Sequence, residues 1–280
     1  MKVRRPAVAG QFYPSDPSEL KSEIRAAFEG PQGPGKLPPG VFDGDVIATV
    51  NPHAGYEYSG GFASHSFYAL SSKKGADIAV VLGPNHYGLG SGVAAPESEA
   101  WDTPLGRVDV DVKAARRLMV DSHLVDLDDS SHWREHSIEV QVPFLQFVFG
   151  SGFKLLPVSM ALQDISTAID VGDQVARLLR GRNYILIASS DFTHYEPAAD
   201  AEAKDEEAIG RILDFDVPGL YRIIERRNLT MCGYGPIAAV MTAAKQLGAD
   251  KAKLLRYGSS GDVTGDFSSV VGYASIAFYR

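Results

Sequence analysis

Short, largely apolar runs recur along the chain and alternate with stretches of helical periodicity. The apolar runs occupy residues 46–50, 78–82, 155–160, 184–188 and 270–278. They are rich in Val and Ile and lack strict alternation, which is typical of strands buried on both faces. Between them, apolar positions at helical spacing predict helices over residues 64–70, 112–120, 137–149, 165–179 and 201–213.

This alternation predicts an α/β fold, with a mostly parallel central sheet that helices cover on both faces. The last run, 270–278, contains Gly272 and alternates in part, which favours an antiparallel or edge strand. Near the N-terminus, Asp16, Pro17 and Glu19 give a helix-start signal: an N-cap, a proline at the first helical position and a capping box.

One segment, residues 30–40, is too rich in Pro and Gly for a helix or a central strand, and we expect a surface loop there. Because this segment lies so early in the chain, it separates one helix from the body and does not divide two domains. Residues 1–280 are therefore expected to form a single domain.

Composition narrows the classes of function. The 280 residues carry a net charge of −8 and no stripe rich in Lys and Arg, which argues against nucleic-acid binding. No apolar run approaches the roughly 18 residues of a membrane span, and the basic residues near the N-terminus precede no apolar signal segment. A single cysteine forms no disulfide within the chain, so a reducing, cytoplasmic setting is expected.

Three of the predicted strands end in similar polar sequences. Each is followed by a turn-forming residue and then by histidine: His53 after 46–50, His86 after 78–82, and His194, together with Asp191, after 184–188. The carboxyl ends of parallel strands face the ligand crevice of an open α/β sheet, so these side chains should converge. Histidine paired with Asn, Asp or Ser at three strand ends predicts a functional site with metal-binding capacity.

The other histidines carry weaker signals. His65 and His123 have no polar companion at ligand spacing, and His132 is expected at the surface or as a cap. His136 and Glu139 form an i, i+3 pair on one predicted helix face. That pair fits either an ordinary helix N-terminus or the rim of the site.

Cys232 lies between Met231 and Gly233, just before an apolar helical run over residues 237–244. A thiol near a helix N-terminus is favoured as thiolate, the form that binds metals or attacks electrophiles. The alternative is a small buried hydrophobic residue, which is the usual environment of a free cysteine. The flanking glycines indicate close backbone approach and favour the site.

Six motifs in order make the chain resemble the Memo family, whose prokaryotic members are called AmmeMemoRadiSam system protein B. The motifs are RPAVAGQFYP from Arg5, PHAGY from Pro52, GPNH from Gly83, EHSIEVQ from Glu135, SDFTHY from Ser190, and Cys232-Gly233. The resemblance covers almost the whole chain and implies the fold of class III extradiol ring-cleaving dioxygenases.

By motif, the resemblance makes His53 and His86 metal ligands and His194 the acid/base residue, with Asp191 beside it to fix its tautomer. In the dioxygenases a glutamate completes the Fe(II) site. Here Cys232 takes that position, as is usual in Memo proteins, and a thiolate makes the site softer, toward Cu or Zn, while still permitting iron. We therefore expect the chain to share the fold of these dioxygenases but not their ring-cleaving activity.

The leading hypothesis is a non-haem redox or dioxygenase-like metalloenzyme with Fe(II) as its metal, or else Cu. A small phenolic or carbonyl substrate would lie among Tyr56, Tyr87 and Tyr195, with His136 at the rim. One alternative is a non-enzymatic adaptor that binds peptides or phosphopeptides, as eukaryotic Memo proteins are regarded. Another is a zinc hydrolase. The family name also implies association with radical-SAM and AMMECR-type proteins.

Overall fold

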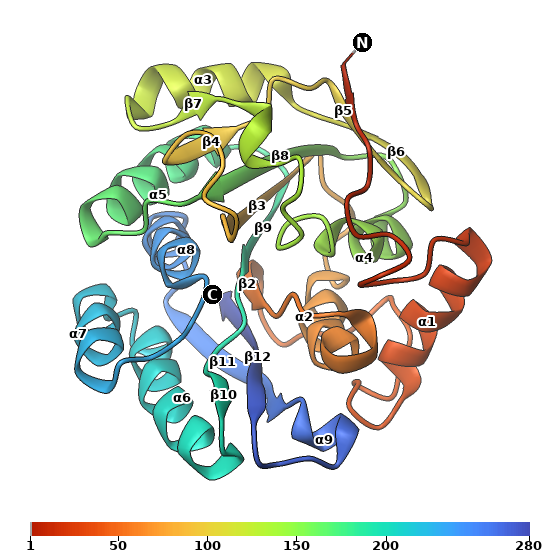
Figure 1. The fold of residues 1–280 in the computed structure, drawn as a ribbon. Coiled ribbons are helices and arrows are strands. Elements are labelled where there is room, and N and C mark those ends of the chain that lie inside the picture. Colours follow the sequence, from red (N-terminus) through yellow and green to blue (C-terminus); the bar gives the residue numbers. More distant parts are fainter. Residues whose placement is uncertain (1) are drawn as a thin grey trace.

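The computed structural model describes residues 2–280 and is built around one large sheet (Figure 1). Its strands, in spatial order, are β10 (His194–Glu196), β12 (Val270–Tyr279), β2 (Val46–Asn51), β9 (Tyr184–Ser189), β3 (Ile78–Pro84), β8 (Lys154–Met160), β4 (Val93–Ala95) and β7 (Asp126–Leu127), and β11 (Lys251–Ser259) pairs with β12. All five predicted strands are present. Short apolar runs between turns therefore identified the middle of the sheet.

The centre of the sheet is parallel and its flanks are antiparallel. β2, β9, β3 and β8 run in the same direction. β12 pairs antiparallel with β2, and β4 pairs antiparallel with β8. The predicted α/β class is confirmed, as is the antiparallel course of β12. The sheet is mixed, because β12 and β4 pair antiparallel with the two edges of the parallel core, while β7 pairs parallel with β4.

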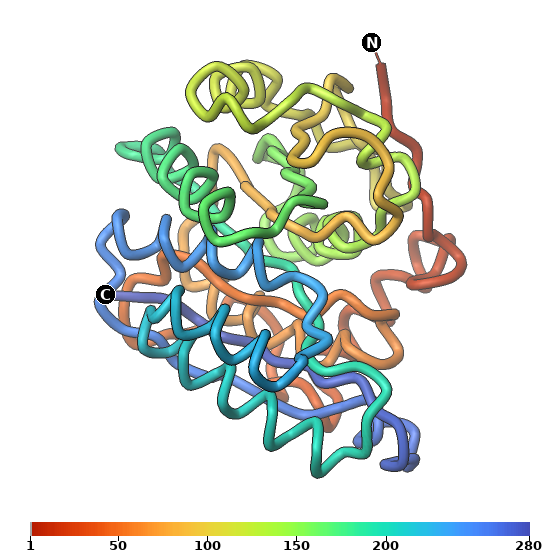
Figure 2. The backbone as a smooth tube through the Cα atoms, turned by 60° about the vertical axis from the view of Figure 1, so that its left-hand side comes forward, coloured from red at the N-terminus to blue at the C-terminus, as the bar shows by residue number. Residues whose placement is uncertain are grey.

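Helices cover both faces of this sheet (Figures 1 and 2). One face is covered by α3 (Val112–Ser122), α5 (Ile165–Leu179), α6 (Ala198–Leu213), α7 (Val217–Arg227) and α8 (Tyr234–Gln246). The other is covered by α1 (Pro17–Glu29), α2 (Gly61–Leu70) and α4 (Gln141–Phe149). Successive strand residues alternate between the two cores, as in β3, where Val80 packs on one face and Val81 on the other.

The predicted helix starts follow the expected chemistry. The Asp16 carboxylate accepts from the backbone N–H groups of Ser18 and Glu19 and caps α1, with proline at the first position. Asp164 caps α5 in the same way, and α5 has the predicted bounds 165–179. Helix α4 begins at Gln141, four residues later than predicted, because residues 137–140 form turns.

Smaller elements complete the chain. A separate sheet joins β1 (Val3–Arg4), β5 (Ala100–Thr103) and β6 (Gly106–Asp109), while single turns form a π-helix at Tyr56–Gly60, a 3-10 helix at Asp129–Ser131 and α9 (Gly261–Thr264). Residues 30–40 contain turns and bends without helix or strand. No helix in the described part of the chain has the length and apolarity to cross a bilayer.

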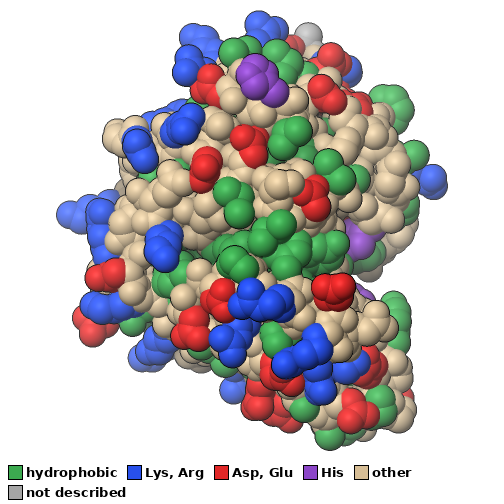
Figure 3. Space-filling view, turned by 90° about the vertical axis from the view of Figure 1, so that its left-hand side faces the viewer, with side chains coloured by type: hydrophobic (Ala, Val, Ile, Leu, Met, Phe, Trp, Pro, Cys, Tyr) green, Lys and Arg blue, Asp and Glu red, His purple; other side chains and the backbone are tan. Residues whose placement is uncertain are grey.

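The surface carries charges of both signs. Figure 3 shows one face of the molecule, on which basic and acidic side chains lie interspersed. The margin at its right-hand side is indented, and histidine side chains are visible there.

Candidate metal centre

The three histidine-bearing strand ends converge as predicted. β2, β9 and β3 are neighbours in the sheet, so the segments that follow them meet at one edge. They form the floor of a cavity of about 650 Å³. Its lining residues are Phe12, His53, Ala54, Gly55, Tyr58, His86, His136, Asp191, His194, Tyr195, Ser260, Thr264, Asp266, Ser269, Val271 and Tyr273.

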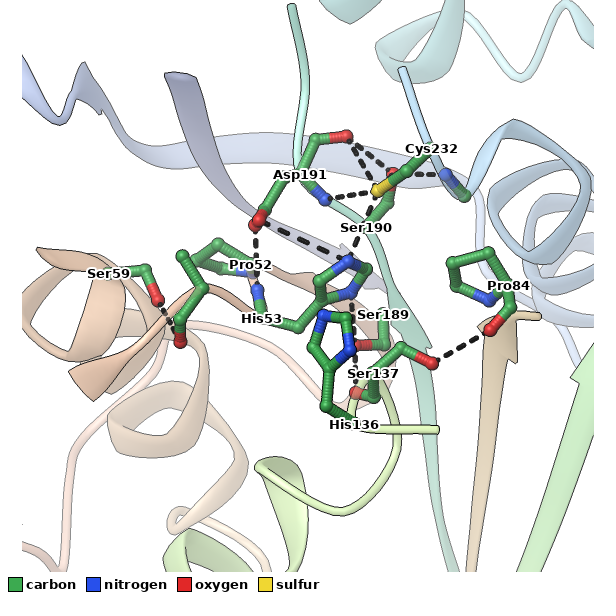
Figure 4. A network of polar contacts seen from close by, with 12 residues as sticks. Pro52, His53, Ser59, Pro84, His136, Ser137, Ser189, Ser190, Asp191 and Cys232 are labelled. Carbon is green, nitrogen blue, oxygen red and sulfur yellow. Dashed lines mark hydrogen bonds and ion pairs between the residues drawn. The ribbon is translucent and has the colours of Figure 1, made fainter. Parts of the chain in front are cut away.

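The tautomer of His53 is fixed by a chain of hydrogen bonds (Figure 4). The Ser189 hydroxyl donates its single proton to the carbonyl of Ser137, at 2.6 Å. The Gln141 amide donates to the Pro52 carbonyl and to Ser189 Oγ, both at 2.9 Å. Ser189 Oγ lies 3.0 Å from His53 Nδ1 and has no proton left to offer, so Nδ1–H must be the donor. His53 Nε2 therefore keeps its lone pair.

His86 is oriented by a carboxylate. Glu135 accepts from the His86 backbone N–H at 2.6 Å and from the His86 Nδ1–H at 2.9 Å. Burial opposes ionisation of Glu135, but the His86 hydrogen bond and the nearby histidines lower the pKa of Glu135 to about 2. A carboxylate on Nδ1 leaves Nε2 of His86 as the free donor atom, the usual arrangement of a metal-binding histidine.

Cys232 joins His53 from the segment that precedes α8. Its Sγ lies 3.1 Å from His53 Nε2 and accepts from the Asp191 backbone N–H at 3.2 Å. Because His53 Nε2 carries no proton, the thiol donates to it. Burial, reinforced by Asp191, raises the pKa of the Cys232 thiol. The expected stabilisation of a thiolate by the helix N-terminus is thus outweighed by burial, and a cation would be needed to hold the anion.

These three side chains fit a metal ion. Ligand atoms of His53, His86 and Cys232 all lie within 4.8 Å of one another. Two imidazoles with fixed free nitrogens and one thiol form a donor set of intermediate softness, suited to iron, copper or zinc. The predicted ligand residues are therefore brought together, and His53 and His86 also line the cavity. His86, Glu135 and His136 satisfy the same distance criterion, but the Glu135 carboxylate already accepts from His86.

His194 and Asp191 both line the cavity, but they do not make the contact with each other that was expected. The His194 ring lines the cavity, but its Nδ1 lies 2.6 Å from the Phe192 carbonyl, which fixes the tautomer. Asp191 accepts from the His53 backbone N–H at 2.7 Å. Burial raises the pKa of Asp191 to about 6. The expectation that Asp191 fixes the tautomer of His194 is wrong, because a backbone carbonyl does so.

His136 forms part of the cavity wall. Its ring stacks on His86 with centroids 4.5 Å apart and contacts Phe12 at 4.6 Å. Burial lowers the pKa of His136 to about 4. Its predicted partner Glu139 points elsewhere and pairs with Arg4 at 2.6 Å. Of the two interpretations of His136, the rim of the site agrees with this position. The predicted pair of His136 and Glu139 on one helix face does not exist.

The aromatic wall differs from the predicted one. Tyr56 is buried outside the cavity, with its hydroxyl bonded to the Val140 carbonyl at 2.6 Å. Tyr87 is half exposed and absent from the lining. Only Tyr195 of the three lines the cavity, and the sequence did not indicate its companions Tyr58 and Tyr273. Which tyrosines line the cavity depends on the direction of each side chain in its turn, and the position of a tyrosine in the sequence does not indicate that direction.

His132 was expected at the surface or as a cap, but it is 1% exposed. Its ring lies edge-on against Trp101, and burial, together with Arg4, lowers the pKa of His132 to about 4. The run of polar residues around it suggested solvent exposure. Instead, this segment is covered by the N-terminal residues, whose Arg4 Nε donates to the His132 carbonyl.

Comparison with known proteins identifies the family. The family described as Memo-like protein matches residues 4–277. A MEMO1 family protein of Methanopyrus kandleri is 48% identical and covers 99% of both chains. One of Methanosarcina acetivorans is 49% identical with the same coverage, and one of Methanocaldococcus jannaschii is 46% identical over 98% of both chains.

A solved structure shares the fold at low identity. The crystal structure of an uncharacterized protein, JW3007, from Escherichia coli K12 superposes with a TM-score of 0.56 and 15% identity. The match covers 82% of this chain and 98% of that one. The full-length similarity to the archaeal relatives and the converging motifs lead to one conclusion: the chain belongs to the Memo-like protein family.

Proposed function

We propose that this protein is a metal-dependent oxidoreductase with a dioxygenase-like site, in which His53, His86 and Cys232 hold Fe(II) or copper. The observation that supports this most directly is the fixed tautomer of both imidazoles. Ser189 and Glu135 occupy the two Nδ1 atoms, so both Nε2 lone pairs remain available beside the thiol. Such outer partners orient metal-binding histidines and raise their basicity.

His194 is the group that moves a proton in this proposal. Its Nδ1–H donates to the Phe192 carbonyl at 2.6 Å, which leaves Nε2 as an acceptor on a ring that lines the cavity. A phenolic substrate would lose its hydroxyl proton to this nitrogen, because an imidazole nitrogen with a free lone pair acts as a general base. A redox-active ion held by His53, His86 and Cys232 would supply polarisation of the ionised phenol, with dioxygen as the external oxidant of a dioxygenase-like reaction.

Other residues bind and shield the substrate. Phe12 and Tyr58 line the cavity and offer ring surface against which an aromatic substrate would stack. Tyr273 is 2% exposed and packs against Phe62, so it forms a buried part of the cavity wall. The Asp191 carboxylate holds the backbone of His53 and thereby keeps the ligand loop in place.

The cavity lining disfavours the phosphopeptide alternative. Its charged residues are Asp191 and Asp266, and none of its described lining residues is Lys or Arg. Phosphate recognition in proteins relies on Arg and Lys or on exposed N–H groups at helix starts. A phosphate group entering here would meet carboxylates.

Metal analysis after anaerobic purification tests the proposal. We expect stoichiometric iron or copper in the wild type and loss of that metal in His53→Ala and Cys232→Ser. His123→Asn is the matched control, because His123 is exposed and caps α3 with a positive φ that Asn tolerates. Circular dichroism establishes that each variant is folded. Zinc in place of iron or copper would support a hydrolase instead, and a wild type that neither carries nor takes up metal would overturn the proposal.

A further inference from the structure

The candidate substrate cavity has a carboxylate at its mouth and no basic counterpart. Asp266 lines the cavity and follows α9 on the segment that leads to β12. The Ser268 backbone N–H and hydroxyl both donate to Asp266 Oδ1, at 2.9 and 2.6 Å. These bonds orient the carboxylate and leave Oδ2 able to accept from a ligand. None of the described residues lining this cavity is Lys or Arg.

Two adjoining cavities extend the same charge outward. A cavity of about 310 Å³ shares Tyr58 with the main one, and a cavity of about 410 Å³ shares Phe12. Their charged lining residues are Glu19, Glu23, Glu57 and Asp262, and again no Lys or Arg occurs among the described lining residues. Together with Asp266, these four carboxylates are called the acidic rim below. Such a rim raises the local concentration of cations and lowers that of anions.

Aromatic side chains supply the second requirement for a cationic aromatic ligand. Phe12 and Tyr58 stand where the main cavity meets its neighbours, and Tyr195 lies beside His194 with ring centroids 5.7 Å apart. Ring faces bind aromatic substrates by stacking and attract ammonium groups through their quadrupole. The cavity therefore offers ring surface for an aromatic ligand and, at the acidic rim, carboxylates for a positive charge.

We propose that the substrate of this site is a phenol that carries a protonated amino group, and that Asp266 selects it. This inference rests on the proposed function, because the phenolic end is assigned to the cavity floor near His194. The amino end would then extend toward Asp266, where a carboxylate substituent of equal length would be repelled. Asp266 is in this sense a specificity-determining residue, and it lies apart from the residues that hold the metal.

Three catechols with a neutral, a cationic and an anionic side chain separate the proposed phenol site from the proposed selection of an amino group: 4-methylcatechol, dopamine and 3,4-dihydroxyphenylacetate. Their binding is measured by anaerobic calorimetry on the protein as purified. We expect dopamine to bind roughly three- to tenfold more tightly than 3,4-dihydroxyphenylacetate at low salt, with the ratio falling as salt rises. Asp266→Asn should reduce the ratio. Asp109→Asn, which removes the same charge from exposed β6, should not.

Equal or tighter binding of 3,4-dihydroxyphenylacetate would overturn the assignment of an amino phenol, and so would equal effects of the two Asp variants. In both cases binding of 4-methylcatechol would leave the proposed phenol site standing. If none of the three catechols binds, the phenolic substrate itself is wrong, and this inference falls with it.

Discussion

The guanidinium of Arg4 and the carboxylate of Glu139 form an ion pair at 2.6 Å in the protein interior, with side chains only 3% and 1% exposed. Arg4 also donates to the carbonyls of His132 and Glu135, at 2.7 and 2.8 Å. Glu139 accepts from the Tyr13 hydroxyl at 2.7 Å. The pair thus joins the N-terminal segment to the segment that carries Glu135 and contributes the cavity wall.

Breaking this pair should be costly. Arg4→Met leaves the Glu139 charge unpaired in the interior, and we expect the free energy of unfolding to fall by about 3–5 kcal/mol. Arg5→Met is the control, because Arg5 pairs with Asp102 at the surface, where the arginine side chain is 81% exposed. Its loss should cost less than about 1 kcal/mol. Urea denaturation at pH 7 measures both values, and similar losses in the two variants would refute the argument.

Glu135 should set metal affinity without being a ligand in this proposal. It accepts from the backbone N–H and Nδ1–H of His86 and from the Ser137 N–H, and Glu135→Gln replaces one acceptor oxygen by a donor. We expect the metal affinity to fall about 10- to 100-fold while circular dichroism stays unchanged. Chelator competition measures the affinity. Glu97→Gln, on a surface ion pair with Lys2, is the control, and unchanged affinity in Glu135→Gln would contradict the role.

The sequence predicted the convergence of the histidines better than the residues that orient them. His53 and His86 could be found because strand ends converge in any parallel sheet, and this needs only local patterns. Ser189 and Glu135 could not be assigned, because each meets its histidine across a large separation, 136 and 49 residues respectively. Nothing in the local sequence distinguishes such a residue from a solvated serine or glutamate.

The errors have a related cause. His132 lies in a polar stretch that looks solvent-exposed, yet Arg4 and Trp101 cover it from distant parts of the chain. Tyr56 follows His53 by three residues, but the π-helical turn that begins there directs its ring toward Phe144 and away from the cavity. Burial and side-chain direction depend on tertiary packing, so local periodicity did not determine them.

Asp205 should make stability depend on pH. Burial raises the pKa of Asp205 from its ordinary value of 3.8 to about 6, against the hydrogen bonds from Thr193 and Tyr257. The folded protein therefore holds this proton more tightly than the unfolded chain does. Binding of this proton stabilises the folded protein by about 2–3 kcal/mol. The stabilisation is fully present below pH 4 and is lost as the pH rises through 6.

The comparison with Asp205→Asn isolates this group. Relative to the variant, the wild type should lose about 2–3 kcal/mol of unfolding free energy between pH 4 and pH 7, because Asn does not ionise. Urea denaturation at several pH values measures the difference. Asp200→Asn, which removes an exposed carboxyl from the same helix α6, is the matched control. A flat difference for Asp205→Asn would show that its carboxyl is not held protonated by burial.

A side chain at position 233 should displace the neighbouring Cys232, because it would collide with atoms at the end of β9. A Cβ at this position would lie 2.5 Å from the Ser189 carbonyl oxygen and 2.7 Å from Ser190 Cβ. Gly233→Ala must therefore push the Cys232 segment away from the end of β9, at a cost of about 1–3 kcal/mol and with weaker metal binding. Gly210→Ala is the matched control, because nothing lies within 4 Å of its added Cβ in α6. It should stabilise the protein by about 0.5–1 kcal/mol. If thermal unfolding shows both variants stabilised, the backbone around Cys232 has room to move, and Gly233 does not hold the thiol against His53.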